Sequence, residues 1–337
     1  MKFAEIAEFF NRMEMTTKRL ELTEILVELL KSTPVEVISK IVYLLQGKLR
    51  PNFEGIELGI AEKLAMKSIA KSAGISIKKI EDDYKTNGDL GKTAANILKQ
   101  KTQTTFSAEN ITLERVYDTL LKIANLEGRG SQDMKIKYIS SLLNDATANE
   151  AKFILKILLG TLRLGIAENT LMNALAIAYT GEKNNREQIE NAYNVSSDLG
   201  HVSEVIAARG IDGILQFEMS VFNPVRPMLA DRVKSEEDAI NKFQGEFAAE
   251  YKLDGERAQI HKKGNEIIIF SRSLEQITQY YPDIVEKIPK ILICDDCILE
   301  AEVVAINEST GDFLPFQELM HRRRKYKIEQ AVSDYPI

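Results

Sequence analysis

The chain has 337 residues, of which 44% are hydrophobic and 28% are charged. This length is sufficient for two domains with separate cores, and the composition is ordinary for a protein that folds in water. A formal charge of −6 argues against a polycation that coats nucleic acid without specificity, although it allows a local basic face. Residues 1–14 place acids within their apolar periodicity, so we expect a cytoplasmic protein with no secretory leader and no membrane span.

The chain has two cysteines, Cys294 and Cys297, in the sequence CDDC. A zinc site normally needs a second cysteine pair or two histidines at ligand spacing, and neither follows. We therefore predict no metal site and interpret both cysteines as reduced thiols. His201, His261 and His321 are far apart in sequence and are interpreted as surface or packing residues.

The first two thirds of the chain are predicted to be helical. Apolar residues from Leu22 to Leu30 recur at the spacing of one buried helical face. Thr33, Pro34 and Glu36 then predict a helix start with a capping box, in which the threonine and glutamate side chains satisfy backbone N–H groups.

A second capping box is predicted from Thr147 and Glu150, and the helix that follows is expected to end at Gly160. Another apolar helix is expected over Glu168–Tyr179. No internal repeat of fixed period is found, which argues against stacked solenoid units. The default prediction for this region is an all-α domain.

The pattern changes where Pro224 and Pro227 flank Arg226 and interrupt any helix. Beyond this point four runs are predicted to be strands, with a hairpin turn at Gly264 between the second and third: 246–254, 256–263, 266–273 and 298–306. We therefore predict an all-α domain over residues 1–216 and an α+β domain with antiparallel strands over residues 217–337.

The sequence EYKLDGERAQIH, residues 250–261, contains a lysine, aspartate, glycine and arginine in the spacing KxDGxR. This spacing is typical of nucleotidyltransferases that carry a nucleotide on lysine. A free lysine has a pKa of about 10.4 and attacks a phosphate only when it is unprotonated, so nearby cations are needed. Arg257, Arg272 and a Mg²⁺ ion that arrives with ATP are the candidates.

If residues 246–254 form a strand, Lys252 and Asp254 point to the same face, so the lysine is expected beside a carboxylate. Glu300 and Glu302 also share a face of their predicted strand. A carboxylate at Glu302 is suited to accept a hydrogen bond from a ribose hydroxyl. Each of these charged residues taken singly is more simply interpreted as a solvated strand position.

The basic run HRRRKYK covers His321–Lys327. A run of this kind most often forms a solvated helix face, and we predict a surface helix here. Lys325 and Lys327 form a KxK pair of the kind that binds triphosphates, but they are left out of the predicted site.

Two loops in the helical region are candidate phosphate contacts. Gly128 and Gly130 precede a helix for which Ser131 is the predicted N-cap, and backbone N–H groups at a helix start can hold a phosphate. The loop TLRLGIAENT presents Arg163 in a similar way. Loops that only cap helices are more common, so these candidates depend on the lysine motif for support.

Several further stretches are similar to one family along nearly the whole chain: IVYLLQGKL, FEGIELGIAEKL, GDLGKTA, GRGSQDMKIKYISSLL, EAKFILKILLGTLRLGI, RPMLA, FSRSLE, LEAEVVA and PFQELMHRRRKY. With EYKLDGERAQIH, they resemble the ATP-dependent DNA ligases of archaeal and eukaryotic type. The resemblance implies a helical DNA-binding domain on the minor-groove side of a nick, followed by an adenylation domain. The family's GEG loop reads GRG here.

The resemblance also implies roles for the predicted residues. Lys252 is the expected nucleophile that takes AMP from ATP, and Glu250 is the expected contact to the adenine amino group. Arg257 and Arg272 are expected at the ribose and phosphates, and Glu302 at the ribose. The AMP would pass to the 5′-phosphate of a DNA nick, where the adjacent 3′-hydroxyl displaces it.

The family continues beyond the position of Ile337 with further adenylation-domain strands, a metal-site glutamate, a KxK pair and an OB-fold domain. Their absence here leaves three interpretations open: a truncated chain, a pseudogene-like fragment, or half of a split enzyme completed by a partner chain. A cut sheet exposes an edge and an apolar face, which the split interpretation would cover.

Two other functions compete with a DNA ligase. An RNA ligase or a capping-type guanylyltransferase would also use KxDG, but the helical first domain and the RPMLA junction argue against both. A nick-binding module with an inactive adenylation half is the non-enzyme alternative.

Overall fold

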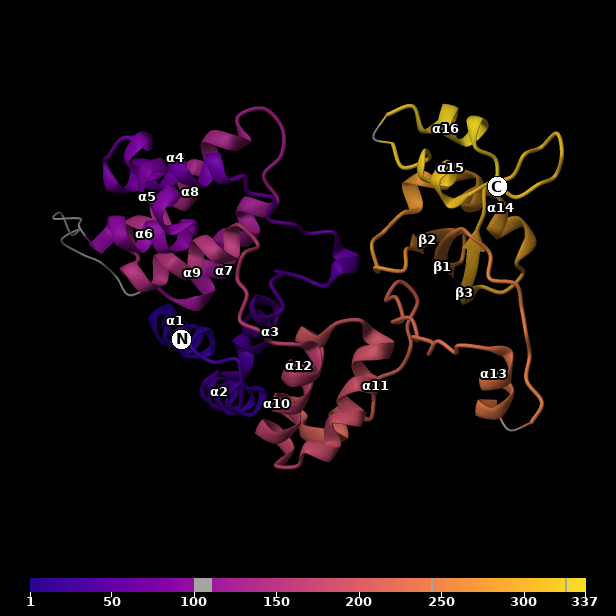
Figure 1. Cartoon of the computed structure of the whole chain (residues 1–337), viewed down its shortest axis with the longest axis horizontal. Helices are drawn as coiled ribbons and strands as arrows, with labels where there is room; N and C mark the ends of the chain where they lie inside the picture. The colour runs from indigo at the N-terminus through magenta and orange to yellow at the C-terminus, as the bar shows by residue number, and fades with distance from the viewer. Residues whose placement is uncertain (100–110, 244, 325) are drawn as a thin grey trace. The chain divides into compact units, whose positions relative to one another are not determined.

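The computed structural model describes residues 1–99, 111–243, 245–324 and 326–337 (Figure 1). It divides into two compact units. The helical unit comprises Met1–Pro51, Gly55–Tyr193 and Asp198–Phe217, and the sheet unit comprises Asn52–Glu54, Asn194–Ser197 and Glu218–Ile337. The predicted fold class, a helical region followed by a small antiparallel sheet with helices, is confirmed. In the described ranges, every helix is too short or too polar to traverse a bilayer.

The helices that begin in the helical unit are α1 (Phe3–Glu14), α2 (Arg19–Ser32), α3 (Ile38–Leu45), α4 (Glu62–Ala73), α5 (Ile77–Asn87), α6 (Leu90–Lys99), α7 (Leu113–Ala124), α8 (Ser131–Asp145), α9 (Ala148–Leu158), α10 (Glu168–Thr180), α11 (Arg186–Ser196) and α12 (Leu199–Ile214). The 3₁₀ turns Val35–Val37 and Lys183–Asn185 precede α3 and α11. The predicted apolar face of α2 is buried, as periodicity of this kind requires.

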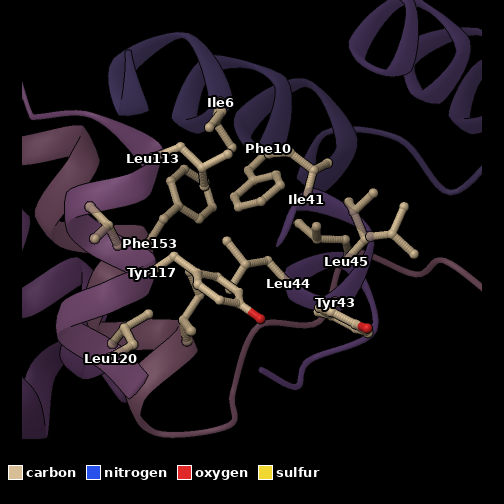
Figure 2. Packing of buried hydrophobic residues seen from close by; sticks show 14 of the residues in the cluster. Ile6, Phe10, Ile41, Tyr43, Leu44, Leu45, Leu113, Tyr117, Leu120 and Phe153 are labelled. Carbon is tan, nitrogen blue, oxygen red and sulfur yellow. The ribbon is translucent and has the colours of Figure 1, made fainter. Parts of the chain in front are cut away.

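The core of the helical unit includes residues from each of its helices, among them the apolar faces of α1, α3, α7 and α9. Figure 2 shows Phe10 of α1 and Phe153 of α9 close to Leu113 of α7. The two phenyl rings meet edge to face, with centroids 5.3 Å apart and planes at 72°. This arrangement places the positive ring edge against the negative face of the other ring.

The helical unit consists of two related halves. Phe3 N donates to the Ile111 carbonyl at 2.8 Å, and Leu113 N donates to the Met1 carbonyl at 3.0 Å, so the starts of α1 and α7 are joined reciprocally. Helix packing is reciprocal too: α2 packs on α10 and α8 on α4, while α3 packs on α12 and α9 on α6. Such an exchange of partners is what an approximate two-fold axis produces.

The helices α3 and α9 also end in the same turn. Gly47 and Gly160 have positive φ angles of 72° and 64°. The residue after each glycine donates its N–H to the carbonyl five positions earlier, on Tyr43 at 3.0 Å or on Lys156 at 2.8 Å. This is the Schellman arrangement, in which a left-handed glycine lets the last carbonyls of a helix find donors.

Two short motifs recur in the two halves. LGIAE begins at Leu58 and at Leu164, before α4 and α10, and DLG begins at Asp89 and at Asp198, at the starts of α6 and α12. The two copies of LGIAE begin 106 residues apart and the two copies of DLG begin 109 residues apart, because the stretch between the two motifs is longer in the second half. A search for a fixed period therefore does not detect this repeat.

The sheet unit contains β1 (Glu256–Lys263), β2 (Glu266–Phe270) and β3 (Asp296–Val303), antiparallel in the order β2-β1-β3. Its helices are α13 (Glu236–Phe243), α14 (Pro282–Ile291), α15 (Phe316–Met320) and α16 (Ile328–Asp334), with 3₁₀ turns at Asn52–Glu54 and Thr278–Tyr280. The predicted hairpin turn between β1 and β2 is confirmed, and Gly264 there has a φ of 57°.

The first predicted strand, residues 246–254, is wrong, because this segment carries no ladder pairing in the structure. A strand requires a hydrogen-bonded neighbour as well as alternating side chains. Within the described ranges, the three strands of this sheet pair with one another and do not reach that segment.

The two predicted capping boxes have different outcomes. The one at Thr147 and Glu150 is confirmed, with both reciprocal hydrogen bonds present at the start of α9. The one at Thr33 is wrong, because the Thr33 hydroxyl donates to the Leu29 carbonyl of the preceding helix at 2.8 Å. A threonine hydroxyl can donate to a carbonyl at the end of the preceding helix or accept from an N–H group at the start of the following helix.

The predicted surface helix over HRRRKYK is also wrong. Residues 321–324 form a turn between α15 and α16, and the side chain of Arg322 is fully buried. Arg322 donates two hydrogen bonds to the Asp283 carboxylate, at 3.0 and 2.9 Å, because the guanidinium fork matches a carboxylate. Lys327 has a φ of 59° just before α16, and Lys325 lies outside the described residues.

Candidate functional site

A pocket of about 420 Å³ lies where the segment before β1 meets β1 and β3 in the sheet unit. Its lining residues are Glu250, Tyr251, Lys252, Leu253, Arg257, Glu300, Ala301 and Glu302. Four of the five residues predicted to bind nucleotide or react with it are therefore brought together. The fifth, Arg272, is exposed on the turn after β2 and does not line this pocket.

Gly255 allows the lysine segment to approach β3. A Cβ atom at this position would lie 2.2 Å from the Val303 carbonyl oxygen, which no side chain tolerates without a backbone shift. The Gly255 N–H instead donates to Glu302 Oε1 at 3.2 Å. The glycine of KxDG is thus explained by a close contact between two backbones, a common reason for glycine in a strand.

Arg257 lies on the pocket side of β1 and is paired with a carboxylate. Its guanidinium forms an ion pair with Glu300 of β3, and Gln259 donates to the other Glu300 oxygen at 2.9 Å. Burial alone would raise the pKa of Glu300, but the hydrogen bonds from Gln259 and Arg257 outweigh it and hold the pKa below its usual value. Glu300 therefore remains ionised and fixes the position of Arg257.

Lys252 is exposed at the pocket, as is Glu250. Asp254 is not among the residues that line the pocket. Asp254 Oδ2 instead accepts a hydrogen bond from Phe316 N, at the start of α15, at 3.2 Å. Because residues 250–254 are not a strand, strand alternation does not set the directions of their side chains, and the expected lysine–aspartate juxtaposition stays a prediction.

The charged lining of the pocket consists of three glutamates, one lysine and one arginine. In the described part of the chain no cluster of three or more histidine, cysteine, aspartate or glutamate side chains is arranged to hold a metal. Mg²⁺ nevertheless needs only one or two carboxylates when substrate phosphates supply the other oxygens. The Glu302 carboxylate fits that role chemically, whereas both oxygens of Glu300 already accept from Arg257 and Gln259.

The residues predicted to contact DNA lie in the helical unit. Gly128 and Gly130 have positive φ angles of 79° and 86° just before α8. Ser131 is the first residue of α8 and the left-handed Gly130 is its N-cap, so the prediction of Ser131 as N-cap is wrong by one residue. Arg163 is exposed between α9 and α10. Among the described residues, no hydrogen bond or ion pair joins Arg163 to the turn at Gly128 and Gly130.

Sequence reasoning did not identify Glu256, which begins β1 directly after KxDG. It is buried, it forms an ion pair with Arg323, and it accepts a hydrogen bond from the Tyr281 hydroxyl at 2.5 Å. The sequence offers one indication of this: Glu256 is next to Arg257 on a strand, so the two side chains must point to opposite faces.

A KxDG lysine that shares a pocket with an arginine and with strand carboxylates is typical of nucleotidyltransferases that form a bond to lysine. Comparison with protein families extends this. Residues 2–176 match the model described as DNA ligase N terminus, and residues 227–337 match the model described as ATP dependent DNA ligase domain.

Individual proteins give the same result. The chain is 68% identical over 337 residues to the DNA ligase of Nitrosopumilus maritimus and 62% identical over 337 residues to that of Cenarchaeum symbiosum. It is 45% identical over 344 residues to DNA ligase 2 of Thermofilum pendens. Each comparison covers 100% of this chain and 57% of the relative. The chain belongs to the DNA ligase family, and it spans little more than half the length of these relatives.

Proposed function

We propose that this chain is the N-terminal portion of an ATP-dependent DNA ligase that seals nicks in duplex DNA. The observation that carries the proposal is the pocket in which Lys252 lies with Arg257, Glu250 and Glu302. The family match of the helical unit supports DNA as the substrate, and it argues against an RNA ligase or a capping-type enzyme. Nicks of this kind arise in DNA replication, repair and recombination in the cytoplasm, where we place the protein.

In the proposed reaction, the unprotonated Nζ of Lys252 attacks the α-phosphorus of ATP. A nitrogen–phosphorus bond forms, the bond to the bridging oxygen of the β-phosphate breaks, and pyrophosphate leaves. The AMP then passes from the lysine to the 5′-phosphate of a nick, and the adjacent 3′-hydroxyl displaces it. Transfer of this kind depends mainly on positioning and on neutralising charge.

The pocket residues have separate roles in this proposal. Glu250 accepts from the adenine amino group, Glu302 accepts from a ribose hydroxyl, and Arg257 faces the ribose and phosphates. Arg272 joins them from the turn after β2. Bound Mg²⁺ would supply neutralisation of phosphate charge, with the substrate phosphates as its main ligands.

The helical unit is proposed to hold the nick. Backbone N–H groups at the start of α8, around Gly128, Gly130 and Ser131, are suited to a DNA phosphate, and the exposed guanidinium of Arg163 is suited to another. The remaining adenylation-domain strands and an OB-fold domain would come from a C-terminal portion, on the same chain or on a partner chain. The longer relatives support this requirement.

The test is self-adenylation. The chain is incubated with α-labelled ATP and Mg²⁺, alone and with the C-terminal portion of the Nitrosopumilus maritimus DNA ligase, and label on the protein is mapped by peptide mass. We expect label on the wild type when the C-terminal portion is present and none on Lys252→Ala. Lys263→Ala is the matched control, since this exposed lysine at the end of β1 is outside the pocket.

A nick-binding assay distinguishes the ligase from the alternative, a nick-binding module without adenylation activity. Lys252→Ala should keep its affinity for nicked DNA, because the lysine is a nucleophile and not a DNA anchor. If the wild type binds nicks but takes no label under either condition, the protein is a nick-binding module. Label retained on Lys252→Ala would reject the assigned nucleophile.

A further inference from the structure

The segment that carries Lys252 is anchored at two points by one short stretch of chain. At one end of α15, Phe316 N donates to Asp254 at 3.2 Å. In the turn after α15, Arg323 forms an ion pair with Glu256. The two anchors lie on either side of Gly255, so the backbone of the motif is fixed just after the lysine.

Both oxygens of the Glu256 carboxylate accept hydrogen bonds in this network. One oxygen accepts from Arg323, and the other accepts from the buried Tyr281 hydroxyl at 2.5 Å. Burial and the bond to Glu256 raise the pKa of Tyr281, so its hydroxyl keeps the proton that it donates. Burial alone would lower the pKa of Arg323, but Glu256 outweighs it and holds the pKa above its usual value. Tyr281 therefore keeps its proton and Arg323 keeps its positive charge, as the network requires.

The network lies behind the pocket. Glu256 and Arg257 are adjacent on β1, so their side chains leave opposite faces of the sheet. Arg257 faces the pocket with Glu300, whereas Glu256 faces the core that contains Tyr281. Arg323 cannot touch a nucleotide in that pocket from this face, and any influence must pass through the position of β1.

We propose, building on the nucleotidyl-transfer function above, that Arg323 and Glu256 are a positioning pair that holds the Lys252 segment and Arg257 at the pocket. The pair fixes the first residue of β1, and α15 fixes Asp254 two residues earlier. Without it, the lysine would sample more positions, and the attack on the α-phosphorus would lose rate because reacting atoms must be held in line. Nucleotide affinity would change little, since no contact to the nucleotide is removed.

The first test measures mobility and does not need activity. Lys252 is exposed, and trypsin must bend the chain around it into an extended form, so the cleavage rate after Lys252 reports how firmly this segment is held. We expect cleavage after Lys252 to be about ten-fold faster in Arg323→Met and in Glu256→Gln, with Arg323→Lys intermediate. The double variant should be no worse than the singles, because coupled residues are not additive. Arg324→Met, at the next arginine, is the matched control and should match the wild type.

The second test measures label transfer in the same variants. The rate at saturating ATP should fall about ten-fold in Arg323→Met while KM for ATP stays within about two-fold, and Arg323→Lys should recover part of the rate. The inference is overturned if cleavage after Lys252 is unchanged, or if it rises only in step with cleavage at every other site as in global unfolding. A wild type that takes no label would refute the proposed ligase function, while the cleavage rates would still decide the positioning role.

Discussion

The Lys156 ammonium lies 3.1 Å from the Asp89 carboxylate, at the position that the Tyr43 hydroxyl occupies relative to Asp198 in the other half of the helical unit. In both halves the contact joins the turn of a DLG motif to the helix that packs on it. Lys156 also reaches Glu14 at 2.6 Å and is 7% exposed. At this contact one half of the unit has a buried ion pair, and the other half has a neutral hydroxyl and a carboxylate.

Lys156→Met is expected to destabilise the helical unit by about 3 kcal/mol, because a buried ion pair that loses one partner leaves an uncompensated charge. Burial alone would lower the pKa of Lys156, but its bonds to Glu14 and Asp89 outweigh burial and hold the pKa above its usual value. Urea unfolding followed by circular dichroism measures the loss. Lys290→Met, which breaks an exposed pair with Glu286, should cost no more than about 0.5 kcal/mol. Equal costs for the two variants would contradict this account.

Local signals in the sequence predicted local structure well. The buried face of α2 and the capping box at Thr147 depend on residues within two helical turns, so both could be read without tertiary information. Features that depend on distant partners could not. Arg322 is buried only because Asp283, on α14, supplies its carboxylate, and residues 246–254 fail as a strand because no neighbour pairs with them.

The candidate site was also predicted only in part, because some of its residues are close in sequence and others are brought together from distant parts of the chain. The spacing of KxDGxR indicated Lys252 and Arg257, strand alternation put Glu300 and Glu302 on one face, and the resemblance to the ligases assigned Glu302 and Glu250 to the nucleotide. The Arg323 contact to Glu256 joins residues that are far apart in the chain, and neither periodicity nor a motif indicates it. The two-fold relationship in the helical unit was missed because its copies are not equally spaced.

Gly255→Ala should damage the site through sterics alone. The new methyl group would lie 2.2 Å from the Val303 carbonyl and 3.0 Å from Glu302 Cγ, so β1 and β3 must separate. We expect a loss of about 2 kcal/mol in unfolding free energy, together with loss of label transfer from ATP. Gly245→Ala is a matched control, because its Cβ meets open space. Wild-type stability in Gly255→Ala would show that the two strands can adjust.

Arg322→Met should be among the most destabilising single changes in the sheet unit. It leaves the Asp283 carboxylate and the Tyr335 carbonyl without the donor that binds both. We expect a loss of about 3–5 kcal/mol, measured by urea unfolding. Adding Asp283→Asn should recover part of this loss because it removes the unpaired charge. If the double variant is no more stable than Arg322→Met, the cost arises from packing around the guanidinium.

The stability of the sheet unit should depend on His261 in mildly acidic solution. Its Nδ1 accepts from Phe222 N at 2.8 Å, which requires an unprotonated nitrogen, and burial lowers the pKa of His261 from 6.5 to about 4. Between these values the unfolded state binds more protons than the folded state. The stabilisation is therefore complete above pH 6.5 and is lost as the pH falls toward 4, by up to about 3 kcal/mol.

Urea midpoints measured from pH 7.5 to pH 4 check this prediction. His261→Gln should flatten the decline, and His321→Gln, at an exposed histidine, should keep the wild-type profile. Identical profiles for wild type and His261→Gln would mean that another group causes the acid sensitivity.

Arg163→Ala is expected to weaken binding to nicked DNA and to reduce its dependence on salt. A guanidinium that contacts a phosphate displaces bound counterions, so removing it should lower the slope of log affinity against log salt by about one. Binding is measured by fluorescence anisotropy at several salt concentrations with the full chain. Arg12→Ala, at a surface arginine paired with Glu28, is the control and should keep the wild-type slope. If both variants show the wild-type slope, Arg163 does not contact a phosphate, and the DNA interface must be sought elsewhere on the helical unit, beginning with the turn at Gly128 and Gly130.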